Sequence, residues 1–285
     1  MANCLEFVRL LNTPVKGIEL FEARLTKHRF GKHFHDAYTI GLNEAGLGQC
    51  MHGERQHYHY PGVFNCINPG EIHTGEAVAG KSWTLRNLYI SQTVARDYLS
   101  ELGYPTTHAL PCFSHISVED IPLKRLFIQL FTVLENPTSL LEQQSLLFQF
   151  FSQLFVRYTW LSKPSDRDRS ETFPIATVRA YIKANCVDDF SIQCLATLVD
   201  LNPYYLIRCF REQVGTSPHQ YKLHWQLQRA KQMIVQEDIA IAQIAADCGF
   251  YDQSHLSRTF KRTFGVSPGH YRKVNFVQAC RWLPL

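Results

Sequence analysis

The most constraining feature of this 285-residue sequence is an internal repeat near its C-terminus. Seven residues of one segment recur, in the same order, fifty positions later. Self-similarity at a fixed period is the sequence signature of one structural unit used twice. The repeat joins Leu206, Arg208, Phe210, Gly215, Ser217, Pro218 and Tyr221 to Leu256, Arg258, Phe260, Gly265, Ser267, Pro268 and Tyr271.

Each copy is predicted to be two short helices joined by a tight turn. In the second copy, Ile244 lies on the inner face of the first helix and Gly249 ends that helix. Asp252 is a candidate N-cap of the next helix, in which Leu256 and Phe260 point inward. Because the outer face of that second helix is polar and basic, the pattern predicts a helix-turn-helix.

The outer faces carry residue types that suit DNA. In the major groove Arg bonds guanine bidentately, Gln bonds adenine, and Ile can touch a thymine methyl, while Lys and other Arg side chains hold phosphates. Two copies with Arg at one position and a basic residue three later favour a DNA-binding face over an ordinary solvated one. The predicted DNA-contacting residues are Tyr204, Ile207, Arg208, Arg211, Gln253, Ser254, Ser257, Arg258, Lys261 and Arg262.

Residues 218–235 connect the two copies and are predicted to form one amphipathic helix. Its apolar positions are Leu223, Leu227, Ala230 and Ile234. At 1.5 Å per residue this helix spans roughly 27 Å, near the roughly 34 Å of one DNA turn. A single chain is therefore predicted to bind two successive major-groove segments.

The charge distribution supports an anionic partner for the C-terminal part. The net charge of the chain is +4, and residues 174–285 hold 13 Lys and Arg against 8 Asp and Glu, a balance of +5. A basic excess confined to one part of a chain is typical of nucleic-acid binding. The predicted macromolecular partner is double-stranded DNA.

Cysteine usage and the lack of targeting signals indicate the compartment. The nine Cys are an odd number without a C-x-x-C pair, which argues against a disulfide framework and a zinc ribbon. No secretory signal is evident, and the most apolar window, residues 146–161, is too short to span a bilayer. We therefore expect a cytoplasmic protein with no membrane partner.

The N-terminal part has a different pattern. Residues 20–90 read as short strands rich in β-branched and aromatic residues, separated by turns at short intervals, which predicts a β-barrel or sandwich. Between residues 91 and 161 the apolar period becomes helical. Those helices are expected to pack on the barrel, to pair with a second subunit, or both. Residues 162–173 are polar and charged and are predicted to be a linker.

The segment IAQIAADCGFYDQSHLSRTFKRTFGVSPGHYR, residues 241–272, resembles the C-terminal signature of the AraC/XylS family of bacterial transcription regulators. The resemblance implies that Arg208, Arg258 and their neighbours contact DNA. Ile207 departs from the polar residue often found at that place, so no hydrogen bond to a base is expected there.

The segments KHFHDAYTIGLNEAG and PGVFNCINPGEIHTG resemble the cupin-like sensor domain common at the N-terminus of this family. The resemblance implies a small β-barrel that holds an effector, followed by helices that often dimerise. The predicted fold class is α+β. Its domains are a cupin-like barrel with dimerisation helices (1–161), a linker (162–173) and an all-α DNA-binding domain with two helix-turn-helix units (174–285).

Three histidines are the main candidates for chemistry in the barrel. The two imidazoles of a His-x-His pair on one strand share a face, and a third histidine completes a possible set of three nitrogen ligands. Metal cupins usually add a Glu four to six residues after the pair, but Thr39–Gly41 occupy that window. We therefore predict polar contacts to an organic effector and no metal or other cofactor. A metal site and ordinary barrel histidines remain the alternatives.

Strand residues add further candidates, Trp83, Arg86 and Tyr89 among them. Arg86 lies in an apolar strand, so its partner is either an effector carboxylate or solvent. The predicted effector-binding residues are His33, His35, Tyr38, His73, Trp83 and Arg86.

The predicted function is that of a DNA-binding transcription regulator, not an enzyme, that responds to a small-molecule effector. RNA polymerase is an expected partner if the protein is an activator, and a homodimer is left open. Two alternatives stand beside this prediction: a metal-dependent cupin enzyme fused to a DNA-binding domain, and an effector-independent DNA-binding protein.

Overall fold

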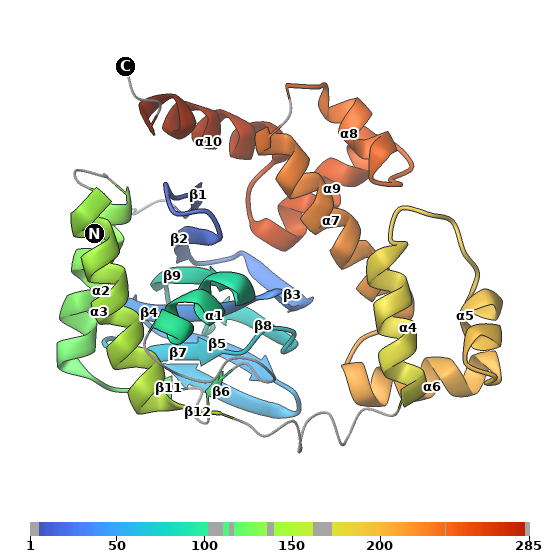
Figure 1. Ribbon diagram of the computed structural model, residues 1–285, viewed down its shortest axis with the longest axis horizontal. Helices are drawn as coiled ribbons and strands as arrows, with labels where there is room; N and C mark the ends of the chain where they lie inside the picture. Colours follow the sequence, from blue (N-terminus) through green and yellow to red (C-terminus); the bar gives the residue numbers. More distant parts are fainter. Residues whose placement is uncertain are drawn as a thin grey trace. The chain divides into compact units, whose positions relative to one another are not determined.

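The computed structural model describes most of the chain, in two compact units that lie within Met1–Lys163 and Pro164–Phe276 (Figure 1). The first unit is rich in β-structure and the second is helical, so the predicted α+β fold class is confirmed. The described residues are 6–101, 111–113, 117–135, 140–161, 173–236 and 238–282. Apart from Phe173, the predicted linker lies outside them.

The described residues of the first unit form two larger antiparallel sheets and one short strand pair. The six-stranded sheet has the order β1-β2-β9-β4-β7-β11 and the four-stranded sheet the order β3-β8-β5-β6, while β10 pairs with β12. The strands are β1 (Phe7–Asn12), β2 (Ile18–Leu25), β3 (Arg29–His33), β4 (Ala37–Gly46), β5 (Gly48–His52), β6 (Arg55–His59), β7 (Phe64–Ile67), β8 (His73–Ala77), β9 (Trp83–Ser91), β10 (Pro111–Phe113), β11 (Ser117–Val118) and β12 (Thr159–Leu161).

Both faces of the larger sheet are covered. Its central strand β4 is buried without interruption from Tyr38 to Asn43. On one side, Phe64 of β7 packs on Phe127 of the helical layer at 5.4 Å between ring centroids. On the other side, Phe21 of β2 meets Phe30 of β3 at 6.0 Å. The larger sheet therefore lies between helices and the smaller sheet.

Helices α1 (Gln92–Glu101), α2 (Ile121–Glu135) and α3 (Leu140–Tyr158) follow the strands. The apolar positions at helical spacing are buried along α2 and α3, except that Tyr158 is partly buried, so these helices pack on the unit as expected. The carboxylate of Asp120 accepts hydrogen bonds from the Leu123 N–H at 2.8 Å and from the Tyr158 hydroxyl at 2.7 Å. It therefore caps α2 and ties that helix to α3.

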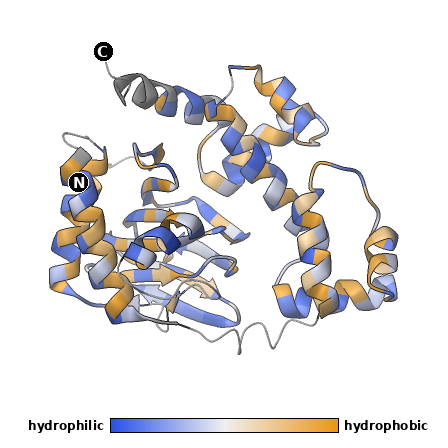
Figure 2. Cartoon of the chain, viewed as in Figure 1, coloured by the Kyte–Doolittle hydropathy of each residue, from blue (hydrophilic) through white to orange (hydrophobic). Residues whose placement is uncertain are grey.

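The second unit contains α4 (Phe173–Ala184), α5 (Ile192–Leu198), α6 (Pro203–Val214), α7 (Pro218–Gln236), α8 (Ile241–Asp247), α9 (Gln253–Phe264) and the part of α10 (Pro268–Trp282) that extends to Phe276. These helices carry hydrophobic and hydrophilic residues side by side along one element (Figure 2). They therefore bury one stripe and expose the other. Among the described residues no helix has the length and hydrophobicity needed to cross a membrane.

Candidate DNA interface and ligand site

Local hydrogen bonds define the helices of both repeated units. Asn202 caps α6 by accepting from the Tyr204 N–H at 2.9 Å, and Asp252 caps α9 by accepting from the His255 N–H at 2.6 Å. Each helix ends at a glycine in the left-handed conformation, Gly215 (φ 80°) and Gly265 (φ 79°). Left-handed backbone disfavours other residues, which accounts for one pair of repeated positions.

The repeated apolar residues anchor each unit. Leu206 and Phe210 on α6 are fully buried, as are Leu256 and Phe260 on α9. The repeated tyrosines close the same cores from the following helices: Phe210 packs on Tyr221 at 5.6 Å, and Phe260 packs on Tyr271 at 5.7 Å. Burial of such side chains contributes roughly 1.5–3 kcal/mol each. The repeat in the sequence is therefore a repeat of one packing arrangement.

The repeated Ser-Pro pair begins the next helix in both units. Ser217 accepts a hydrogen bond from the Gln220 N–H at 3.3 Å, and Ser267 accepts one from the His270 N–H at 3.2 Å. Each serine is thus an N-cap, and the proline after it takes the first helical position, where its missing N–H costs little.

Helices α6 and α9 present the predicted DNA-contacting residues on their outer faces. Most of these side chains are exposed, and Tyr204 is 85% exposed. Two are partly buried, Ile207 and Ser257, at equivalent positions of the repeat. The exposed members are Tyr204, Arg208, Arg211, Gln253, Ser254, Arg258, Lys261 and Arg262. Tyr251, which sequence reasoning missed, is 93% exposed just before α9.

The two repeated arginines have different neighbours. Arg208 lies 3.8 Å from the carboxylate of Glu212, one helical turn later, and its guanidinium stands 5.2 Å from the ring centroid of Tyr205. In the second unit the position of Glu212 is taken by Arg262. The second helix-turn-helix therefore offers a more positive outer face than the first.

Helix α7 connects the two helix-turn-helix units. At 19 residues it is about 28 Å long, and the four predicted apolar positions on it are buried. Sequence reasoning missed its buried polar residues. The Gln226 amide donates to the Gly249 carbonyl at 3.2 Å, and the Lys231 ammonium lies 5.2 Å from the ring centroid of Phe264. These contacts fix the second helix-turn-helix unit to α7.

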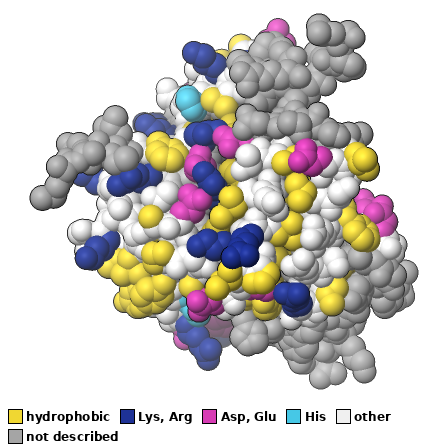
Figure 3. Space-filling view, turned by 90° about the vertical axis from the view of Figure 1, so that its left-hand side faces the viewer, with side chains coloured by type: hydrophobic (Ala, Val, Ile, Leu, Met, Phe, Trp, Pro, Cys, Tyr) yellow, Lys and Arg dark blue, Asp and Glu magenta, His cyan; other side chains and the backbone are white. Residues whose placement is uncertain are grey.

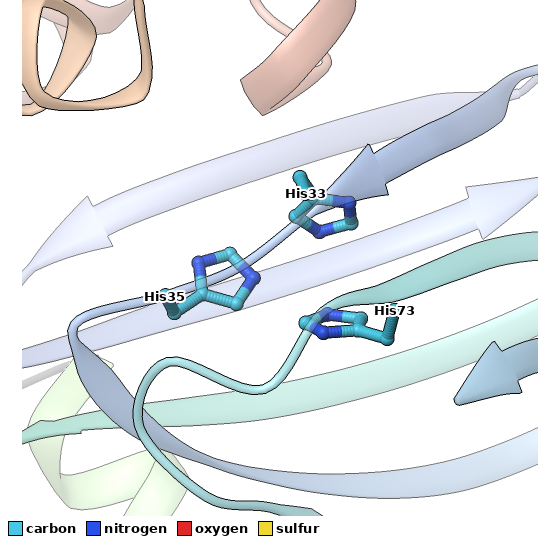
Figure 4. Close-up of side chains that lie close together, drawn as sticks. All are labelled: His33, His35 and His73. Atoms are coloured by element: carbon cyan, nitrogen blue, oxygen red, sulfur yellow. The ribbon is translucent and has the colours of Figure 1, made fainter. Parts of the chain in front are cut away.

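In the first unit of the fold, three histidines surround one point (Figure 4). His33 ends β3, His35 follows it by two residues, and His73 begins β8. The ring centroids are 4.9 Å apart for His33 and His35, 4.3 Å for His33 and His73, and 5.2 Å for His35 and His73. The strand register that pairs His33 with His73 brings these three predicted residues together. They are called the histidine cluster below.

The histidine cluster continues into a closed circuit of aromatic rings. The ring centroids of His33 and Phe30 are 6.0 Å apart, and those of Phe30 and Phe21 are also 6.0 Å apart. The centroids of Phe21 and Tyr89 are 6.0 Å apart, and those of Tyr89 and His35 are 4.6 Å apart. The circuit crosses from the smaller sheet to β2 and β9 of the larger one. Phe21 and Phe30 carried no sequence signal that separated them from ordinary strand aromatics.

Burial favours the neutral form of two cluster imidazoles, those of His33 and His73. It lowers the pKa of His33. Burial, together with the nearby His33, His52 and His59, holds the pKa of His73 well below its ordinary value. A neutral imidazole offers one donor and one acceptor nitrogen. The cluster is therefore suited to bind polar groups or a cation at neutral pH.

Trp83 lies in the interior of the same unit, only 5% exposed. His59 stacks on its indole at 5.5 Å, with 10° between the ring planes. A Cβ at Gly48 would lie 2.3 Å from the indole, so this glycine is needed to admit the ring. The indole N–H has no hydrogen-bond acceptor among the described residues. It is thus a buried donor available to a bound molecule.

Tyr38 and Arg86 make their contacts elsewhere. The Tyr38 hydroxyl donates to the Pro111 carbonyl at 2.6 Å, and the ring packs against Phe155 of α3 at 5.4 Å. The Arg86 guanidinium is held by two carboxylates, Glu22 at 3.2 Å and Glu44 at 3.0 Å. Neither an effector carboxylate nor solvent is needed as the partner of Arg86, because the protein itself supplies the acids.

Two family models match this sequence in chain order. The AraC-like ligand binding domain matches residues 15–151, and a helix-turn-helix domain matches residues 195–274. The chain belongs to the AraC family of transcriptional regulators. As an AraC-family regulator it binds DNA sequence-specifically and responds to a small-molecule effector.

Relatives of this AraC-family chain are named as regulators. An uncharacterized HTH-type transcriptional regulator of Bacillus subtilis, YbfI, is 24% identical and aligns over 85% of this chain and 87% of its own length. The probable transcriptional regulator LumQ of Photobacterium leiognathi is 32% identical over 38% of this chain and 43% of its own. Unsaturated fatty acid bound ToxT from Vibrio cholerae shares the fold, with a TM-score of 0.59, 14% identity and coverage of 92% and 96%.

Proposed function

We propose that α6 and α9 are the recognition helices of this regulator and that each enters one major-groove segment. The observation that carries this proposal is the pair of capped helices with matching buried anchors and exposed basic faces. On this basis Arg208 and Arg258 contact bases, with Tyr204, Ile207, Gln253, Ser254 and Ser257 beside them. Arg211, Lys261 and Arg262 hold phosphates.

The histidine cluster and its aromatic circuit form the proposed effector site. Neutral imidazoles supply polar contacts, while the rings of Phe21, Phe30 and Tyr89 supply apolar surface, the usual composition of a small-molecule site. Trp83 contributes the unbonded indole N–H. Arg86 and Tyr38 serve structural roles in this proposal, since their polar groups are already bonded within the protein.

Binding of the effector is proposed to change how the sensor places the recognition helices on DNA. The assignment of residues 1–161 to the sensor, 162–173 to a linker and 174–285 to the DNA-binding domain belongs to this proposal. So do a cytoplasmic location, contact with RNA polymerase if the protein activates transcription, and the absence of catalysis. The relatives are transcription regulators, which supports a regulatory rather than an enzymatic role.

A homodimer through α3 is also proposed. Leu141, Phe148 and Val156 are exposed on this helix, 73%, 41% and 49% respectively, at a spacing that aligns them along one face. The side of the molecule where α2 and α3 lie in Figure 1 faces the viewer in Figure 3, which shows several hydrophobic patches separated by charged side chains. A mixed surface of this kind is compatible with an interface, whose core is apolar and whose rim is polar.

Two measurements on the full chain test the proposed function. Affinity for duplex DNA is expected to fall steeply with salt, because lysines and arginines release counterions from the phosphates. A screen of metabolites by thermal shift is expected to find a ligand that raises the unfolding temperature and changes DNA affinity. A flat salt response contradicts the DNA interface, and ligands that shift stability without changing DNA affinity contradict effector control.

A further inference from the structure

We propose that the histidine cluster binds one divalent first-row transition-metal ion through a ring nitrogen of each of His33, His35 and His73. Each residue offers one ligand atom, and these atoms all lie within 4.8 Å of one another. Nitrogen ligands sit roughly 2.0–2.1 Å from zinc, so ligands on one ion stand closer together than this. Because His33 and His35 are only partly buried, small side-chain rotations bring the set to coordination distance.

Backbone carbonyls orient two of the three ligands. The Nδ1 atom of His33 lies 2.7 Å from the Gly31 carbonyl oxygen, and that of His73 lies 2.9 Å from the Glu71 carbonyl oxygen. Since a carbonyl only accepts, each Nδ1 carries the proton and each Nε2 keeps its lone pair for a metal. A histidine that binds a metal through one ring nitrogen usually donates a hydrogen bond from the other.

The strand register makes the arrangement a built feature of the fold. β3 pairs with β8 so that His33 stands opposite His73, after a register shift between Phe30 and His33. β8 also pairs with β5, which places His52 on the other side of His73. His52 is engaged by the Glu71 carboxylate at 2.9 Å, and Glu71 supplies the carbonyl that orients His73. Three neighbouring strands thus position the cluster.

The ligand set determines the kind of ion. Imidazole suits zinc, copper, iron and nickel, whereas magnesium and calcium take oxygen ligands. No carboxylate belongs to the cluster in the described part of the chain, so a divalent ion would keep its full charge. Three imidazole ligands also leave at least one coordination position for water or an anionic group of a ligand.

The absence of a Glu at Thr39–Gly41 does not prevent this binding. Three histidines with an exogenous ligand are a complete zinc set in other proteins. The inference therefore departs from the expectation of no metal drawn from the sequence. It concerns the proposed effector site but does not rest on the organic effector or on DNA binding.

The test is a titration of the full-length, chelator-treated protein with Zn²⁺, followed by calorimetry, with Co²⁺ as a spectroscopic probe. One equivalent is expected to bind, with affinity at least tenfold weaker in His73→Ala and in the more exposed His33→Ala. His57→Ala in the same sheet and His219→Ala on α7 are the controls and are expected to bind as the parent protein does.

Circular dichroism of each variant separates loss of ligand from loss of fold. A folded His33→Ala or His73→Ala protein that binds Zn²⁺ like His57→Ala overturns the proposal, as does a parent protein with no saturable Zn²⁺ or Co²⁺ site. DNA affinity of the metal-free and metal-loaded protein is measured separately. Normal DNA binding without a metal site refutes only the metal-binding proposal. A metal site without DNA binding refutes only the proposal that α6 and α9 are recognition helices.

Discussion

The two repeated arginines are equivalent in sequence but not in their electrostatic surroundings. Arg208 has a carboxylate at 3.8 Å, from Glu212, whereas Arg262 replaces that acid beside Arg258. An exposed ion pair of this kind is worth little to stability. If Arg208 contacts DNA as proposed, this carboxylate competes with DNA for the guanidinium.

Arg258→Ala is therefore expected to weaken binding to a specific site by about 1–3 kcal/mol and to relax preference at one base. Arg208→Ala is expected to cost less, because that side chain must first leave Glu212. Binding to specific and random duplexes, measured for both variants at one salt concentration, checks this. Equal losses on both duplexes would mean that Arg258 contacts phosphate and not a base.

His59 makes the stability of the first unit depend on pH. Burial, with a contribution from His57, lowers the pKa of His59 from 6.5 to about 4. Between these values the unfolded chain binds a proton that the folded chain does not, so stability falls as pH falls through this window. From pH 7 to pH 5 the loss is about 2 kcal/mol for this group.

Chemical denaturation at pH 7 and pH 5 checks the effect. The variant His59→Asn is expected to lose about 2 kcal/mol less on acidification than the parent protein does. His219→Asn, at an exposed position of α7, is the control and is expected to keep the parental pH dependence. Identical pH dependence in both variants would show that His59 is not the responsible group.

At the scale of elements, the two helix-turn-helix units differ at the start of their first helices. Ser191 caps α5 by accepting from the Cys194 N–H at 3.2 Å, but Ala240 at the start of α8 supplies no side-chain cap. Its extended backbone, with φ −61° and ψ 143°, is compatible with a capping residue.

Ala240→Ser is expected to raise the free energy of unfolding by about 0.5–1 kcal/mol, because it supplies the missing cap. Ser191→Ala is the matched opposite change and is expected to lower it by about 0.5–2 kcal/mol. Urea denaturation of the two variants measures both changes. A destabilised Ala240→Ser protein would mean that the start of α8 is set by tertiary packing instead.

The exposed apolar stripe of α3 makes the proposed dimer testable. Phe148→Ser is expected to weaken self-association at least tenfold and to leave the unfolding free energy within about 0.5 kcal/mol of the parent value. Sedimentation equilibrium measures the association, and the neighbouring exposed Gln149→Ser is the control. If the parent protein sediments as a monomer, or if both variants associate alike, this stripe is not the interface.

For the whole molecule, the sequence predicts the fold best where a single physical requirement, such as a left-handed backbone or a buried helix face, determines the residue pattern. The offset of fifty revealed the two-unit domain because Gly215 and Gly265 need left-handed backbone and because Tyr221 and Tyr271 close equivalent cores. Helical spacing likewise predicted α2 and α3, since burial of one face imposes that period.

Interior contacts between distant strands could not be predicted in the same way. Arg86 in β9 finds Glu22 and Glu44 only because β2 and β4 flank β9. The circuit through Phe21, Phe30 and Tyr89 depends on two sheets that face each other. The cupin-like character of the barrel stays a prediction, as do the individual DNA and effector contacts.

The central claim is that one chain reads two successive major-groove segments with α6 and α9. In vitro selection of duplexes by the full-length protein from a random library tests it most directly. We expect enriched sites with two half-sites of different sequence roughly 10 base pairs apart, one relaxed by Arg208→Ala and the other by Arg258→Ala. Enriched sites with a single half-site would contradict the claim. So would two half-sites of which one keeps its sequence preference in both the Arg208→Ala and the Arg258→Ala protein.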